Sequence, residues 1–222
     1  MSFTVKICGL STPETLDVAL DAGADMVGFV FFPPSPRHLA FETARALGRR
    51  VRGRAQKVAL TVDADNEFLA AVLEALQPDI LQLHGTESTA HVQAIQRIFG
   101  LPVMKALPIA AKSDLERIAP YASVADRLLF DARAPHEATR PGGLGNTFDW
   151  RLLEAVTPGV PYMLSGGLDA GNIGEALRIT QASGVDVSSG VERAMGVKDP
   201  DKIGAFVRAA RAAAAHRVHS AA

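Results

Sequence analysis

The stretch FTVKICGLSTPETLDVALDAGADMVGFVFF, residues 3–32, decides the fold of this 222-residue chain. It begins with an apolar run typical of a strand, continues through a segment typical of a helix, and ends in a second apolar run. Thr12 suits the N-cap of that helix, Pro13 its first position and Gly23 its end. A strand, a crossover helix and another strand make up the βαβ unit of a parallel sheet. The chain therefore opens on one complete unit of such a sheet.

The same unit repeats along the chain. We expect strands to start near Phe3, Met26, Lys57, Asp79, Pro102, Asp126, Pro161 and Val185. Segments with apolar residues three and four apart lie between them, at residues 41–51, 66–76, 87–100 and 112–122, and a last helix spans about 200–214. Eight strands that alternate with eight helical segments predict an α/β fold, the (β/α)8 TIM barrel.

A doubly wound open sheet is the main alternative, but no G-x-G-x-x-G motif follows the first strand. Nothing resembling a linker divides the chain. We therefore predict a single (β/α)8 barrel domain over residues 1–214 and a polar C-terminal tail over residues 215–222.

Composition limits the partners. The formal net charge is -1, so charge gives no reason to expect nucleic acid or an anionic membrane as partner. No apolar run approaches the roughly 20 residues that span a bilayer. A single cysteine cannot form an internal disulfide, and the first strand begins too early to leave room for a signal peptide. We expect a cytoplasmic protein, and the sequence is compatible with a monomer or a homodimer.

Side chains that could carry chemistry stand where the strands end, which is the active-site face of such a barrel. Side chains alternate along a strand, so Lys6 and Cys8 share one face and would point to the barrel mouth. Asp131 directly follows the apolar run of the sixth strand. Each has an ordinary alternative, because a lone cysteine is often a small buried apolar side chain and an aspartate often caps a helix. His84 and Ser188 are further candidates for the rim, and His84 also suits a hydrogen-bonded structural role.

Glycine-bearing loops follow the seventh and eighth strands, at SGGL (165–168) and SSGVE (188–192). In barrels these two loops often bind phosphate, helped by the N-terminus of a short extra helix. We expect residues 190–196, GVERAMG, to form that helix.

Two more loops reach the same rim. The long aperiodic segment between Asp131 and Trp150 has the features of a mobile lid. The loop FPPSPRHL after the second strand brings Arg37, which could bind a substrate carboxylate through two hydrogen bonds or could be an ordinary surface arginine.

Several motifs resemble the phosphoribosylanthranilate isomerases of tryptophan biosynthesis. They are KICGL (6–10), GFVFFPPSPRHL (28–39), LQLHG (81–85), GG-x-G-x-x-FDW (142–150), SGGL (165–168) and DVSSGVE (186–192). The resemblance runs from Lys6 to Glu192, in order and at the expected strands. It departs at Ser165, where alanine is common, and at Leu144, where a small polar residue is common.

The resemblance implies an Amadori rearrangement of N-(5'-phosphoribosyl)anthranilate without a metal or an organic cofactor. It implies that Cys8 is the general base, Asp131 the general acid and Arg37 the carboxylate-binding residue. It also implies that the phosphosugar substrate is held through its phosphate by Gly166, Gly167, Ser189 and Gly190. An unperturbed thiol is mostly protonated at neutral pH, so Cys8 needs a cationic neighbour, for which Lys6 and Arg37 are candidates.

Three alternatives predict other chemistry. The related barrel isomerase of histidine biosynthesis has an aspartate where this chain has Cys8. A phosphosugar-binding barrel without catalysis would not need both Cys8 and Asp131. A lyase that forms a Schiff base through Lys105 would need that lysine at the mouth, and the alternation of the fifth strand does not place it there.

Overall fold

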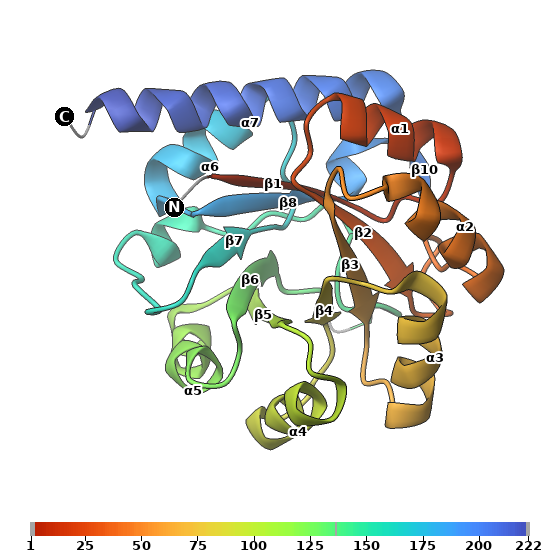
Figure 1. Cartoon of the computed structure of the whole chain (residues 1–222). Helices are drawn as coiled ribbons and strands as arrows, with labels where there is room; N and C mark the ends of the chain where they lie inside the picture. Colours follow the sequence, from red (N-terminus) through yellow and green to blue (C-terminus); the bar gives the residue numbers. More distant parts are fainter. Residues whose placement is uncertain (1–2, 136, 221–222) are drawn as a thin grey trace.

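The computed structural model describes residues 3–135 and 137–220, the last four of these by backbone alone. Its centre is a closed barrel of eight parallel strands in sequence order, in which β1 pairs with both β2 and β8 (Figure 1). The strands are β1 (Thr4–Cys8), β2 (Met26–Phe31), β3 (Gln56–Thr61), β4 (Ile80–Leu83), β5 (Val103–Ile109), β6 (Arg127–Ala132), β7 (Tyr162–Leu164) and β8 (Gly184–Val187). Each starts within about one residue of its predicted position, so the predicted barrel is confirmed.

Helices surround the barrel, and the last one lies along α1 and α6 (Figure 1). They are α1 (Pro13–Asp21), α2 (Phe41–Val51), α3 (Asn66–Leu76), α4 (Thr89–Phe99), α5 (Ile118–Ala122), α6 (Ile173–Thr180) and α7 (Pro200–Ser220). Thr12 caps α1 as predicted, because its side chain accepts a hydrogen bond from the Thr15 backbone N–H at 3.3 Å. None of the described helices is both long and apolar enough to cross a membrane.

The helical prediction is wrong in three places. Between β6 and β7 the described chain forms only a short 3₁₀ turn, η2 (Trp150–Leu153), in place of an α-helix. The segment predicted at 112–122 divides into a 3₁₀ helix, η1 (Lys112–Arg117), and the short α5. The last helix continues beyond Ala214 to Ser220, because its alanine-rich sequence has no helix breaker there.

The predicted extra helix at GVERAMG is also wrong. Only a 3₁₀ turn, η3 (Ser189–Val191), follows β8, and an antiparallel hairpin of β9 (Glu192–Ala194) and β10 (Val197–Lys198) comes next. Gly196 adopts a left-handed backbone (φ 76°) at the turn, which suits a tight hairpin better than a helix. The hairpin folds the chain back toward the end of β8.

Two apolar layers support the barrel. The larger lies between the strands and the helices, and the smaller fills the barrel interior. The interior layer consists of Met26, Val58, Ile80, Met104, Ala106, Leu129 and Met163. Polar side chains occupy inward positions two residues farther along three of these strands, at Gln82, Asp131 and Ser165. The apolar layer therefore closes the barrel from below, and polar groups gather at the C-terminal ends of the strands.

Candidate active site

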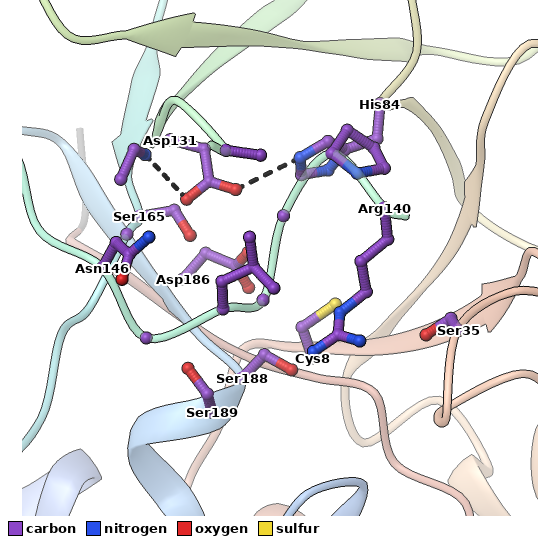
Figure 2. A pocket seen from close by; sticks show the side chains of 18 of the residues that line it. Cys8, Ser35, His84, Asp131, Arg140, Asn146, Ser165, Asp186, Ser188 and Ser189 are labelled. Carbon is purple, nitrogen blue, oxygen red and sulfur yellow. Dashed lines mark hydrogen bonds and ion pairs between the residues drawn. The ribbon is translucent and has the colours of Figure 1, made fainter. Parts of the chain in front are cut away.

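A cavity opens at the C-terminal ends of the strands (Figure 2). Most of the residues predicted from the sequence line it, namely Cys8, Arg37, His84, Asp131, Gly166, Gly167, Ser188 and Ser189. They come from six different strands or from the loops that follow them. The closed barrel therefore brings together groups that lie far apart in the sequence.

Two predicted residues do not line the cavity. Lys6 faces inward as expected, but its side chain is wholly buried inside the barrel, so it does not lie on the rim. Its Nζ lies 2.9 Å from the Asp186 Oδ1. Gly190 instead allows close packing, since a Cβ there would lie 1.9 Å from the Leu168 carbonyl oxygen. It lets the loop after β8 rest against the loop after β7.

Cys8 is a buried free thiol beside the Lys6–Asp186 pair. A Cβ placed on Gly28 would lie 2.8 Å from the Cys8 Sγ and 3.2 Å from the Lys6 Cε, so both side chains pack over this glycine. Burial raises the pKa of Cys8, and the positive charges of Lys6 and Lys198 reduce this effect without reversing it. Of the two cations considered from the sequence, Lys6 is the one that acts on the thiol.

Asp131 lies on the other side of the cavity and is held by two contacts (Figure 2). Its Oδ2 is 3.2 Å from the His84 Nε2, and its Oδ1 accepts a hydrogen bond from the Ala132 backbone N–H at 2.9 Å. The Nε2 of Gln82 is 3.1 Å from the His84 Nδ1, so His84 bridges Gln82 and Asp131. Asp131 lies within β6, and no helix begins in the described residues that directly follow this strand, so the helix-cap alternative is wrong.

Arg37 is buried, with a relative exposure of 4%, which rules out an ordinary surface arginine. Its Nε and Nη2 donate to the two carboxylate oxygens of Glu192 at 2.7 and 2.9 Å, and Nη2 also donates to the Gly143 carbonyl at 3.1 Å. Lys198 of β10 donates to the same carboxylate at 2.9 Å. Burial raises the pKa of Glu192, but the hydrogen bonds from Arg37 and Lys198 outweigh it and hold that pKa below its ordinary value.

The loops after β7 and β8 form another part of the cavity wall. Gly166 has φ of 89°, and a Cβ there would lie 2.6 Å from the Ala132 backbone nitrogen. Only glycine suits that conformation and that close approach. Ser189 and Asn146 add polar side chains to the same wall. Backbone N–H groups and hydroxyls in such a concave surface suit an anion.

The loop between β6 and β7, predicted as a lid, covers the mouth. A Cβ on Gly142 would lie 2.5 Å from the Asp131 Oδ2 and 2.8 Å from the His84 Nε2, so this backbone packs directly on the acid group. Gly143 contacts Arg37 through its carbonyl. The loop therefore contacts both Asp131 and Arg37.

Some lining or supporting residues were not predicted from the sequence, above all Glu192, Lys198, Asp186 and Arg140. Asp186 and Glu192 lie in the quoted motif DVSSGVE, and Asp186 shares a strand face with Ser188, which was the one available signal. Lys198 lies beyond that motif, and only the hairpin brings its Nζ to 2.8 Å from the Ser188 carbonyl. Lys105 points away from the barrel interior, as the strand alternation indicated, and its Nζ lies 2.9 Å from the Glu87 Oε2. No cluster of three or more potential metal ligands occurs among the described residues.

These features define a (β/α)8-barrel enzyme with its cavity at the C-terminal ends of the strands. The model of the N-(5'-phosphoribosyl)anthranilate isomerase family matches residues 5–209. An N-(5'-phosphoribosyl)anthranilate isomerase of Nitrobacter hamburgensis is 66% identical over 213 residues, which is 96% of this chain and 95% of that protein. The chain belongs to the N-(5'-phosphoribosyl)anthranilate isomerase family.

Solved structures agree with this assignment. The phosphoribosyl anthranilate isomerase of Thermotoga maritima is 34% identical, with a TM-score of 0.86 over 96% of this chain and 100% of that one. Another structure, 31% identical and with a TM-score of 0.83, contains a phosphoribosyl anthranilate isomerase in complex with reduced 1-(o-carboxyphenylamino)-1-deoxyribulose 5-phosphate. It covers 96% of this chain and 100% of that chain.

Proposed function

We infer that this chain catalyses the Amadori rearrangement of N-(5'-phosphoribosyl)anthranilate to 1-(2-carboxyphenylamino)-1-deoxyribulose 5-phosphate in tryptophan biosynthesis. One observation supports the mechanism: Cys8 and Asp131 line one cavity from β1 and β6, and the glycine-bearing loop after β7 lines the same cavity. Family membership and the ligand of a related solved structure support the reaction.

Asp131 is the general acid. In its protonated form it gives a proton to the ring oxygen of the ribose while the C1'–O bond breaks and the anilino nitrogen forms a C=N bond to C1'. His84 holds the Asp131 carboxyl group at 3.2 Å and keeps it directed at the cavity. The open chain that results is an iminium ion with an acidified hydrogen on C2'.

Cys8 is the general base. Its thiolate takes the proton from C2', the electron pair forms a C1'=C2' double bond, and the iminium nitrogen is neutralised. The resulting enol then tautomerises to the 2-ketone of the product, so no electrons enter or leave overall. Burial favours the neutral thiol, and Lys6 and Lys198 supply the positive potential that makes the thiolate accessible.

The substrate lies across the cavity in this proposal. Gly166, Gly167 and Ser189 bind its phosphate, and the backbone around Gly190 supports that loop. Apolar side chains at the ends of β2 and β3 contact the aromatic ring, namely Val30, Phe32, Leu60 and Val62. Arg37 binds the anthranilate carboxylate through Nη1, the nitrogen that it does not use for Glu192 or Gly143. The fixed orientation of Arg37 lowers the entropy lost on binding.

We also propose that the enzyme acts in the cytoplasm, as a monomer or a homodimer, on a small phosphosugar. Sedimentation at several protein concentrations distinguishes the two oligomeric states.

A turnover assay tests the reaction. The purified protein should consume N-(5'-phosphoribosyl)anthranilate with loss of the substrate fluorescence. The variant Asp131→Asn should lose about 10²- to 10⁴-fold in kcat, the usual contribution of a general acid, and should still bind the reduced product analogue. A stable fluorescence signal with saturating substrate and wild-type protein would refute the function, and the binding-only barrel would then be the better description.

A further inference from the structure

One charged side chain in the cavity wall differs from the others. The remaining charged residues of the wall have ion-pair partners: Arg37 with Glu192, Asp131 with His84, Asp186 with Lys6, and Arg133 with Asp114. Arg140, on the loop between β6 and β7, has no ion pair with any described residue. It therefore adds an uncompensated positive charge to the cavity wall.

The burial of Arg140 makes this more telling. The residue as a whole is half-buried, but its Nε is fully buried and has no hydrogen-bond partner among the described residues. Buried donors in folded proteins almost always have an acceptor, and one without a partner calls for a bound molecule or water. Figure 2 shows the side chain directed from the loop into the cavity, toward the side on which Cys8 lies. An anion in the cavity would supply the missing acceptor.

The position of Arg140 indicates which anion. A second cavity adjoins the first over the ends of β3 to β6, and both Arg140 and Val62 line the two cavities. Gly166 and Ser189, at the ends of β7 and β8, line only the first. Arg140 therefore borders the second cavity as well, whose lining includes Val62 at the end of β3 and does not include Gly166 or Ser189.

We propose that Arg140 determines specificity by binding the carboxylate of the anthranilate group together with Arg37. This inference rests on the proposed function, whose substrate carries one carboxylate besides its phosphate. Arg37 already shares the Glu192 carboxylate with Lys198, whereas Arg140 has no carboxylate partner among the described residues. A planar guanidinium matches a carboxylate through two parallel hydrogen bonds. Because Gly142 and Gly143 of the same loop contact Asp131 and Arg37, carboxylate binding by Arg140 also stabilises the loop over the acid group.

Two ligands that differ only in the carboxylate test the proposal. One is reduced 1-(o-carboxyphenylamino)-1-deoxyribulose 5-phosphate, and the other is its phenylamino counterpart without the carboxylate. Arg140→Gln should weaken binding of the first about 10- to 100-fold, as expected for a hydrogen bond to a charged group, and binding of the second less than about twofold. The affinities are measured by calorimetric titration at constant ionic strength. With the natural substrate, KM should rise more than kcat falls.

Arg151→Gln is the matched control. Arg151 lies in the same β6–β7 connection, but it is exposed, pairs with Asp149 and does not line the cavity. It should leave both affinities unchanged. Equal weakening of both ligands by Arg140→Gln would mean that Arg140 only shapes the loop, and unchanged affinities would leave Arg37 alone on the carboxylate. Either result overturns the proposal. Failure of the wild-type protein to turn over the substrate would instead refute the proposed function.

Discussion

The barrel wall buries two lysine–carboxylate pairs, one on each of its faces. Lys6 of β1 points into the barrel and pairs with Asp186, whereas Lys105 of β5 points outward and pairs with Glu87. Both lysine side chains are wholly buried, and both nitrogen–oxygen distances are 2.9 Å. By geometry alone the two pairs are equivalent.

Their surroundings are not equivalent. Lys105 also donates to the backbone carbonyls of Leu83, Gly85 and Ala106, so it ties the end of β4 to β5. Burial lowers its pKa more than Glu87 raises it. Burial also lowers the pKa of Lys6, but Asp186 and Cys8 together outweigh it and raise the pKa overall. The comparison indicates that the outer pair, Lys105–Glu87, stabilises the fold, whereas the inner pair, Lys6–Asp186, changes the pKa of the reactive thiol.

The largest expected effect, on kcat, comes from substitution of Cys8, the thiol beside the inner Lys6–Asp186 pair. Cys8→Ser should lower kcat about 10²- to 10⁴-fold, because a hydroxyl is a far weaker base than a thiol in the same place. Binding of the reduced product analogue should be largely unchanged. Fluorescence turnover and calorimetry measure the two quantities, and near-full activity of this variant would show that Cys8 is not the base.

In either pair, removal of one partner should strongly destabilise the folded protein, because the other partner is left buried without its counter-charge. Lys105→Gln leaves Glu87 buried without its cation, and the free energy of unfolding should fall by about 3–5 kcal/mol in a urea titration. The double variant Lys105→Gln/Glu87→Gln should recover part of this loss, since no buried charge then remains. If the single variant lost less than about 1 kcal/mol, the outer pair would not have the structural role assigned to it.

The two lysine variants should differ in the pH dependence of kcat/KM. Lys6→Gln removes the cation that lowers the pKa of Cys8, so that pKa should rise further and kcat/KM at pH 7 should fall about 10- to 100-fold. The rise of kcat/KM with pH should also move to higher pH. Activities are measured under conditions in which both variants are fully folded. Lys105→Gln is the control and should retain the pH profile of the wild-type protein. The same displacement of the profile in both variants would contradict the comparison.

The smallest expected effect is on the pH dependence of stability at alkaline pH, where the two lysines should contribute slopes of opposite sign. The folded pKa of Lys105 lies below the ordinary value of 10.5, so the unfolded chain binds more protons just below that pH and stability rises with pH there. The folded pKa of Lys6 lies above 10.5, so the folded protein binds more protons just above it and stability falls. Each slope is at most about 1.4 kcal/mol per pH unit. The free energy of unfolding is measured by urea titration from about pH 9 to 11.5. Its rise with pH should be absent in Lys105→Gln, and its fall with pH should be absent in Lys6→Gln. Slopes equal to those of the wild-type protein would contradict the assigned directions.

Much of the fold is already determined by local patterns. The eight strands follow from apolar runs, and the start of α1 follows from Thr12 and Pro13, because these signals act within one element. Strand alternation also placed Cys8 and His84 toward the cavity, and Asp131 was expected there because it directly follows an apolar run; all three line the cavity. Alternation predicts which face of a strand a side chain occupies, but not how far below the mouth of the barrel it lies. For this reason Lys6 was expected on the rim, although it lies inside the barrel.

Local sequence patterns are enough to predict the barrel, the single thiol at the end of β1 and the glycine loops after β7 and β8. The partners of these groups depend on how the barrel closes. Arg37 and Glu192 are separated by 155 positions and meet because the barrel closes β8 against β1. The GVERAMG segment forms a hairpin, which brings Lys198 to Glu192 and Ser188. Local periodicity contains no information on such contacts, since they depend on closure and on the packing of loops from distant strands.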